Sequence, residues 1–223
     1  MDKSVLITGA NRGLGFALVE TFVNNGYIVY ALIRSEDSRQ ALEKVGAQVL
    51  IGDVSTNEVI TSIETAHIQS LDIIINNAGV AGSGEQTLDY SPDVLSKTLE
   101  TNVVGSFRVI KALASRLKQD GLIINVSSRF GSFQFTKENT HRHCTSHYKI
   151  SKAALNMLTL SLHLEYKDKF KTVAIHPGEI MTSMKSGDAQ LSPEKAAANI
   201  FDCLDIFESG RLYSTTTKQE MNW

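Results

Sequence analysis

Two residues whose types and spacing suit proton transfer are Tyr148 and Lys152. At positions i and i+4 of a predicted helix, their side chains share one face and lie a turn apart. A lysine ammonium near a phenol favours the phenolate, so the pair predicts a tyrosine that exchanges a proton with a bound substrate. Because Tyr-x-x-x-Lys also occurs by chance in many helices, the prediction depends on which other residues join the pair.

A serine hydroxyl is expected at the same place. The β-branched run Leu122–Val126 predicts a buried strand, and Ser127-Ser128 follow it directly. Ligands of open α/β sheets bind outside the carboxyl ends of the strands, where a serine can hydrogen-bond a substrate oxygen. The alternative is ordinary turn chemistry after a strand.

Glycines after the first predicted strand, Val5–Thr8, indicate a phosphate-binding turn. Glycine lets the backbone turn tightly and approach a pyrophosphate, which then sits at the N-terminus of the following helix. The spacing is not G-x-G-x-x-G, and a tight strand-to-helix turn also uses glycine. The residues expected to contact the cofactor here are Gly9, Asn11, Arg12, Gly13, Leu14 and Gly15.

The end of the second predicted strand, Tyr27–Ile33, bears on the choice of cofactor. Enzymes that use NAD place Asp or Glu near this point to bind the ribose 2′-hydroxyl. Here the strand is followed by Arg34, which together with Arg12 could grip a 2′-phosphate through paired hydrogen bonds. The alternative is that both are surface arginines and that the nearby Glu36 and Asp37 serve NAD. NADPH is therefore favoured over NADH.

Strand and helix patterns alternate along the whole chain. The predicted strands are Val5–Thr8, Tyr27–Ile33, Gln48–Ile51, Leu71–Asn76, Leu122–Val126 and Thr172–His176, and the clearest helices cover Leu14–Val23, Val94–Leu117 and the stretch that carries Tyr148. This alternation predicts a Rossmann-type, doubly wound parallel sheet of about seven strands with helices on both faces. A single domain over residues 1–223 is expected, with a cofactor half over about 1–125 and a catalytic and substrate half over about 126–223.

Composition excludes several other functions. The formal net charge of −2 provides no basic field for nucleic acid. No apolar run approaches the roughly 20 residues that span a bilayer, and the N-terminus passes at once into a strand, so neither a membrane span nor a signal peptide is expected. The two cysteines, Cys144 and Cys203, are expected to be free thiols. A cytoplasmic protein is predicted.

Taken together, these residues resemble the motif set of the short-chain dehydrogenase/reductase family. The matching elements, in order, are Thr8-Gly9-x-x-x-Gly13-x-Gly15, Asn76-Asn77-Ala78-Gly79, Asn102, Ser127-Ser128, Tyr148-x-x-x-Lys152 and Pro177-Gly178. Within the family the chain looks most like the small carbonyl-reductase branch that includes C-factor and sniffer proteins, on the evidence of Tyr148–Met157, His176-Pro177-Gly178 and the ending Ser209–Tyr213 to Trp223.

The resemblance implies catalytic roles for four residues. Tyr148 would be the general acid that donates a proton to a carbonyl oxygen, and Ser128 would hold that oxygen. Lys152 would bind the nicotinamide ribose and tune Tyr148, while Asn102 would anchor a water that reprotonates Lys152. A purely structural role is the alternative for Asn102.

The resemblance also implies a cofactor site along the carboxyl edge of the sheet. Asp53 and Val54 would line the adenine pocket, Asn77, Ala78 and Gly79 would form the floor, and Pro177, Gly178 and Thr182 would cradle the nicotinamide. The alternative for the Asn-Asn-Ala-Gly run is again purely structural.

The polar segment between Ser128 and Tyr148 contains histidines and a cysteine: His141, His143, Cys144 and His147. Although His143 and His147 have i, i+4 spacing, a zinc site also needs convergent ligands and a second shell, so no metal is predicted. A solvated loop leading into the catalytic helix is expected. In a third interpretation Phe133, Phe135 or His147 lines the substrate pocket.

The predicted function is NADPH-dependent reduction of a small-molecule carbonyl. One alternative is a cofactor-binding scaffold or signalling protein of the same fold without turnover. Another is an epimerase or dehydratase of the extended relatives, for which the C-terminal region offers little sugar-binding material. Surplus apolar residues on the catalytic helix predict a homodimer through the 92–118 and 146–166 helices.

Overall fold

The computed structural model describes residues 2–81, 86–139, 145–181 and 191–223. Its strands form one eight-stranded sheet in the order β3-β2-β1-β4-β5-β6-β7-β8. The strands are β1 (Ser4–Thr8), β2 (Ile28–Ile33), β3 (Gln48–Ile51), β4 (Leu71–Asn76), β5 (Leu117–Val126), β6 (Phe170–His176), β7 (Arg211–Ser214) and β8 (Gln219–Met221). All neighbours are parallel except β8, which pairs antiparallel with β7. The predicted Rossmann-type fold is confirmed, and β8 is a further short edge strand.

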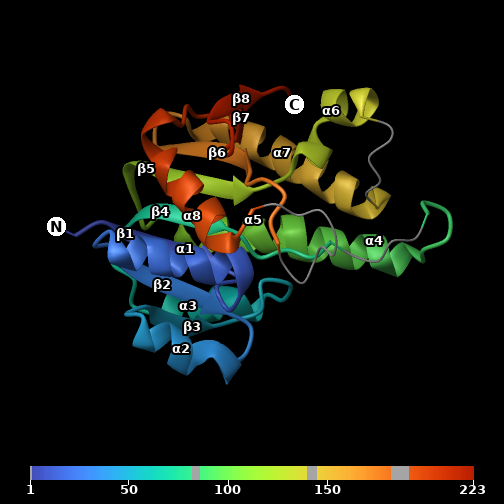
Figure 1. Ribbon diagram of the computed structural model, residues 1–223. Coiled ribbons are helices and arrows are strands. Elements are labelled where there is room, and N and C mark those ends of the chain that lie inside the picture. The colour runs from blue at the N-terminus through green and yellow to red at the C-terminus, as the bar shows by residue number, and fades with distance from the viewer. Residues whose placement is uncertain (1, 82–85, 140–144, 182–190) are drawn as a thin grey trace.

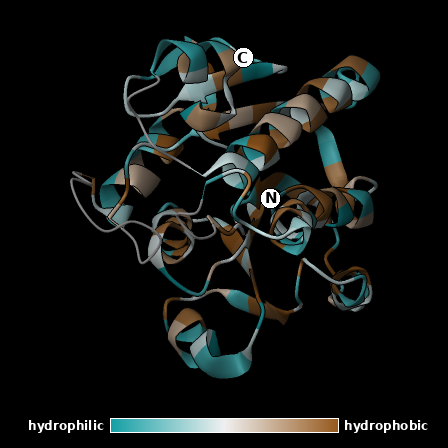
Figure 2. Cartoon of the chain, turned by 90° about the vertical axis from the view of Figure 1, so that its right-hand side faces the viewer, coloured by the Kyte–Doolittle hydropathy of each residue, from teal (hydrophilic) through white to brown (hydrophobic). Residues whose placement is uncertain are grey.

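Helices cover both faces of this sheet (Figure 1). They are α1 (Gly13–Asn24), α2 (Arg39–Lys44), α3 (Glu58–Thr65), α4 (Pro92–Leu99), α5 (Gly105–Leu113), α6 (Phe133–Glu138), α7 (Ser146–Tyr166) and α8 (Pro193–Asp202). Apolar residues, brown in Figure 2, run along the strands and meet the helices.

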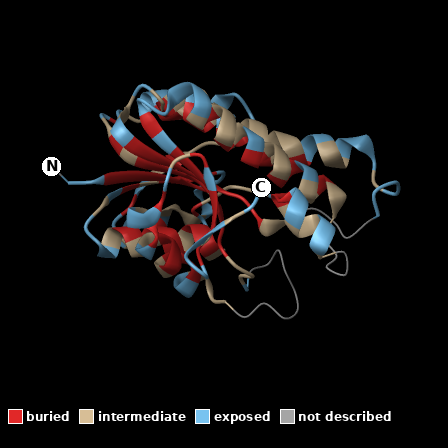
Figure 3. Ribbon diagram, turned by 90° about the horizontal axis from the view of Figure 1, so that it is seen from above, coloured by how far each residue is buried: buried red, intermediate tan, exposed pale blue. Residues whose placement is uncertain are grey.

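Two apolar cores result, one on each face. Val5 and Ile7 of β1 belong to the core that includes α1 and α8, whereas Leu6 between them belongs to the core that includes α3 and α5. Successive side chains of a strand point to opposite faces, so a strand buried on both faces is apolar at consecutive positions. Figure 3 shows the buried strands in red, with exposed residues on the outer helix surfaces.

The expected long helix over Val94–Leu117 was wrong in two respects. It is interrupted by a π-helix, η2 (Glu100–Val104), and α5 ends at Leu113. Leu117 instead begins β5, where it pairs with Leu71 of β4. The apolar period continues through the interruption, so periodicity alone indicates one helix, while pairing with β4 decides where the strand begins.

The segment after Ser128 is also more ordered than the expected loop. Its described part contains a 3₁₀ turn, η3 (Arg129–Gly131), and then α6, at whose start Ser132 Oγ accepts a hydrogen bond from Phe135 N at 3.1 Å. His141, His143, Cys144 and Thr182, for which the sequence made predictions, lie outside the described residues. Within the described ranges, no helix is both long and apolar enough to cross a membrane.

Candidate active site

The carboxyl end of β5 brings three of the predicted catalytic residues together. Ser128 follows the strand and is buried, while Lys152 lies on α7 and is 5% exposed. The Lys152 Nζ donates a hydrogen bond to the carbonyl oxygen of Val126 at 2.8 Å. The same ammonium lies 5.5 Å from the centroid of the Tyr148 ring. The Lys152 ammonium and the Tyr148 ring therefore lie together at the strand end that Ser128 follows.

Burial lowers the pKa of Lys152 from 10.5 to about 8. Its ammonium is consequently still protonated in most molecules at neutral pH, and it keeps the hydrogen bond to Val126. A cation held in a poorly solvated position interacts strongly with any anion beside it, including a phenolate.

Polar contacts fix α7 against β5. Asn125 Nδ2 donates to Thr159 Oγ1 at 2.9 Å, and Ser127 Oγ donates to Asn156 Oδ1 at 2.5 Å. All four side chains are buried. Together with the Lys152 contact, they hold the last two residues of β5 and the following Ser127 to three turns of α7, the helix that carries Tyr148. We did not predict these contacts, because a polar residue in or after a strand does not reveal its partner.

Asn102 connects the chain after β4 to α7. Its Oδ1 accepts from Val80 N at 2.8 Å, and its Nδ2 donates to Val80 O and to Ser151 Oγ, each at 2.9 Å. Ser151 Oγ in turn donates to the carbonyl oxygen of Tyr148 at 2.8 Å. The Asn102 amide is thus part of the support for the first turns of α7, and its role toward a water molecule remains a prediction.

The glycines after β1 form a tight turn that leads into α1. Gly9 has φ +64°, and a Cβ on Gly15 would lie 2.1 Å from the Gly9 carbonyl oxygen and 2.6 Å from Asn77 Nδ2. Gly13 begins α1 with φ +53°. A side chain on Gly9 would collide with Ala78 and one on Gly15 with the Gly9 carbonyl oxygen, so this tight turn into α1 requires glycine at both positions.

Residues that follow β4 form hydrogen bonds with this turn. Asn77 Nδ2 donates to the carbonyl oxygens of Thr8 and Gly9 at 2.9 and 3.2 Å, and Thr8 Oγ1 accepts from the backbone N–H groups of Asn77 and Ala78. A Cβ on Gly79 would lie 3.2 Å from Asn102 Oδ1 and 3.7 Å from Lys152 Nζ. The Asn77–Gly79 run therefore lies between the glycine turn and the Lys152 ammonium.

The two arginines expected at the 2′-phosphate are exposed and lie on neighbouring loops. Arg12 precedes α1 and Arg34 follows β2. Hydrogen bonds from Gly9 N and Ala10 N to the Leu32 carbonyl oxygen join the turn after β1 to the end of β2.

The predicted adenine-pocket residues follow β3 at the same edge. Asp53 Oδ1 accepts from Ser55 N at 2.8 Å and from Ser55 Oγ at 2.7 Å, whereas Val54 is buried. The position of all these loops at the carboxyl ends of adjacent strands fits one extended cofactor.

Beyond β6, Pro177 is buried and Gly178 has φ +97°. The next residue, Glu179, forms an ion pair with Arg129, the residue after Ser128. The Arg129 guanidinium also lies 5.0 Å from the centroid of the Phe135 ring. This pair joins the loops that follow β5 and β6; we did not predict it, because its two residues are far apart in sequence.

The remaining predicted pocket residues differ in exposure. Phe133 is 79% exposed, whereas His147 is fully buried, with Nδ1 3.2 Å from Thr98 Oγ1 and its ring against Tyr90. His147 thus packs against the end of α4 and the loop before it.

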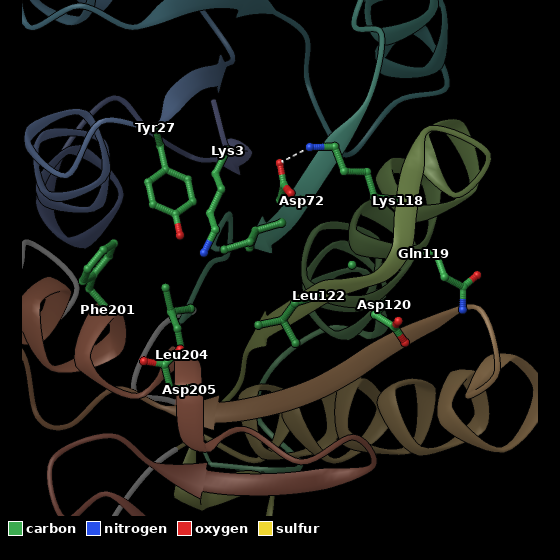
Figure 4. Close-up of a pocket in the computed structure, with 12 residues that line it drawn as sticks. Lys3, Tyr27, Asp72, Lys118, Gln119, Asp120, Leu122, Phe201, Leu204 and Asp205 are labelled. Atoms are coloured by element: carbon green, nitrogen blue, oxygen red, sulfur yellow. Dashed lines mark hydrogen bonds and ion pairs between the residues drawn. The ribbon is translucent and has the colours of Figure 1, made fainter. Parts of the chain in front are cut away.

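A hollow of about 370 Å³ lies at the opposite, amino-terminal edge of the sheet (Figure 4). Its lining includes Lys3, Leu122 and Phe201, together with an ion pair between Lys118 Nζ and Asp72 at 2.8 Å. None of the predicted site residues lines it, so it does not belong to the chemistry predicted here.

The sequence also matches a known family and its members. The short chain dehydrogenase family model matches residues 3–191. L-fucose dehydrogenase of Mus musculus is 31% identical over 189 residues, which cover 82% of this chain and 67% of the relative.

Two solved structures of carbonyl reductases are similar to this chain over its whole length. NADPH-bound carbonyl reductase from chicken fatty liver has a TM-score of 0.88 at 25% identity, covering 100% of this chain and 99% of its own. Carbonyl reductase Sniffer of D. melanogaster has a TM-score of 0.87 at 26% identity, covering 100% of both chains.

Fold, site and matches define an NAD(P)-dependent oxidoreductase that acts on small molecules. The chain belongs to the short-chain dehydrogenase/reductase family.

Proposed function

We propose that this protein is an NADPH-dependent carbonyl reductase, formed by one domain over residues 1–223. The observation that carries the proposal is the buried Lys152 ammonium beside the Tyr148 ring, at the strand end that Ser128 follows. The NADPH-bound carbonyl reductase from chicken supports it by overall similarity.

In the proposed mechanism, each side chain has a separate task. NADPH, when bound, would supply a hydride to the carbonyl carbon. Ser128 donates a hydrogen bond to the carbonyl oxygen, and Tyr148 transfers its phenolic proton to that oxygen as negative charge develops on it. Lys152 stabilises the phenolate that remains, and Asn102 holds α7 in place through Ser151.

The cofactor would lie along the carboxyl edge of the sheet. Gly9, Asn11, Gly13, Leu14 and Gly15 would surround its pyrophosphate, and Arg12 and Arg34 its 2′-phosphate. Asp53 and Val54 would flank the adenine, and Asn77, Ala78 and Gly79 would lie beneath the cofactor. Pro177 and Gly178 would contact the nicotinamide, with Thr182 beyond the described residues.

The test is a screen of ketones, aldehydes and quinones that follows the loss of NADPH absorbance. A substrate whose product is the corresponding alcohol supports reduction. If none of the three classes is turned over by protein that binds NADPH, the scaffold or signalling alternative is favoured instead.

Replacing Arg12 or Arg34 by alanine is expected to weaken NADPH binding by about tenfold or more, since a hydrogen bond to a charged group contributes roughly 1.5–3 kcal/mol. NADH lacks the 2′-phosphate, so its affinity should change little. Calorimetric titration measures both, and Arg211→Ala, an exposed arginine on β7, is the control for lost charge. Equal affinities for the two cofactors in the wild type would contradict the choice of NADPH.

We also propose a homodimer through the α4–α5 and α7 helices. Ile150, Met157 and Leu164 recur every seven residues on α7 and are 43%, 62% and 67% exposed, and Phe107 on α5 is 46% exposed. Met157→Glu should convert a dimer to a monomer in sedimentation experiments, because a carboxylate would be buried in the contact. Ile206→Glu, which changes an exposed residue elsewhere, should not. A wild type that sediments as a monomer at high concentration would exclude this contact.

A further inference from the structure

Arg108 of α5 makes three hydrogen bonds to two separate segments. Its Nε donates to Asn57 Oδ1 at 2.7 Å, and one Nη donates to the Val54 carbonyl oxygen at 3.2 Å. The other Nη donates to Glu100 Oε1 at 2.5 Å. With the side chain only 13% exposed, one planar cation joins the loop after β3 to the π-helix η2.

One arm of this contact reaches the proposed adenine pocket. Val54 is buried, and a Cβ on Gly105 would lie 3.0 Å from its carbonyl oxygen, so the loop packs directly on the start of α5. Arg108 donates hydrogen bonds to that same carbonyl oxygen and to the Asn57 side chain. The position of the loop is therefore set from α5 as well as from β3.

The other arm spans the π-helix. Gly105 N donates to the Glu100 carbonyl oxygen, which closes the wide turn, and Arg108 binds the Glu100 side chain across the same turn. Such turns are rare and are frequently found at functional sites. Asn102 lies inside this turn and holds Val80 and Ser151.

We propose that Arg108 is a positioning residue that fixes the adenine-side loop and the Asn102 turn relative to each other. The proposal rests on the proposed function, because it gives the loop after β3 a role in cofactor binding. It implies that one substitution on α5 disturbs both the adenine-side loop and the Asn102 turn. It also implies that the Arg108 contact with Asn57 and the Arg108 contact with Glu100 have separate effects.

The test compares Arg108→Met with Arg116→Met. Both proteins are studied without cofactor and with a fragment of the cofactor. Arg116 follows the same helix and donates to the carbonyl oxygens of Ile63 and Glu64, so it is a matched arginine that also braces backbone. Calorimetry measures affinity for adenosine 2′,5′-bisphosphate, which carries no nicotinamide. Amide hydrogen exchange measures the protection of the Val80 N–H, which donates a hydrogen bond to Asn102 Oδ1.

Arg108→Met is expected to weaken fragment binding at least tenfold and to speed Val80 exchange at least tenfold, while Arg116→Met does neither. Asn57→Ala should weaken fragment binding alone, and Glu100→Gln should speed Val80 exchange alone. Arg108→Lys keeps the charge but not the fork, so it should fall between the wild type and Arg108→Met in both measurements.

Unchanged Val80 exchange in folded Arg108→Met would overturn the proposal, and so would equal effects of Arg108→Met and Arg116→Met. If Arg108→Met does not fold, Asn57→Ala and Glu100→Gln provide the test. The proposal is rejected if Asn57→Ala does not weaken fragment binding alone or Glu100→Gln does not speed Val80 exchange alone. A wild type that binds neither NADPH nor the fragment would reject the proposed function, while the exchange comparison would still judge the link to Asn102.

Discussion

Replacing Tyr148 by phenylalanine is expected to reduce the rate of carbonyl reduction by roughly 10²–10⁴-fold, the range of general acid catalysis. The change removes one oxygen and leaves the ring beside the Lys152 ammonium. The hydrogen bond that supports this turn of α7 is accepted by the Tyr148 backbone carbonyl, so the substitution leaves it in place. Steady-state rates on any substrate found in the carbonyl screen provide the measurement.

Tyr166→Phe is the matched control, because it removes the same oxygen at the far end of the same helix, where the ring stacks on Phe170. Both variants should bind NADPH with nearly wild-type affinity and unfold at similar temperatures. Near-normal reduction by folded Tyr148→Phe would reject Tyr148 as the proton donor. A wild type with no measurable turnover on any carbonyl, but with intact NADPH binding, would agree with the scaffold alternative.

The fold could be predicted because its strands carry a strong physical signal. A strand covered by helices on both faces must be apolar at consecutive positions, and the β1 residues Val5, Leu6 and Ile7 divide between the two cores for this reason. The start of α8 also follows from local sequence: Pro193 is its first residue, and the preceding Ser192 accepts a hydrogen bond from Lys195 N at 3.2 Å. Local chemistry decides such features, so local sequence reveals them.

The supports of the site could not be predicted, because they depend on which elements the sheet makes neighbours. Ser127 and Asn156 form a buried pair only because α7 crosses the end of β5. Arg129 and Glu179 meet only because β5 and β6 are adjacent. The early end of the predicted 94–117 helix has the same origin, since pairing with Leu71 places Leu117 in β5.

Replacing Lys152 by methionine is expected to slow reduction and weaken NADPH binding, and to change how stability depends on pH. Burial lowers the pKa of Lys152 to about 8 in the folded chain, against 10.5 for an ordinary lysine. Below pH 8 both states hold the proton, and the folded wild type bears the full cost of a buried charge, roughly 3 kcal/mol. Between the two values the unfolded chain binds a proton that the folded chain has released, so this lysine makes the unfolding free energy rise with pH.

Methionine does not titrate, so the unfolding free energy of the wild type minus that of Lys152→Met should increase from pH 7 to pH 10. Urea unfolding of both proteins without cofactor measures this difference, and Lys111→Met, at an exposed position on α5, should show no such trend. A constant difference across the range would mean that the Lys152 ammonium is well solvated. It would then lack the strong interaction with the Tyr148 phenolate on which the proposed proton transfer depends, and the loss of rate in Lys152→Met would have to come from the nicotinamide ribose contact alone.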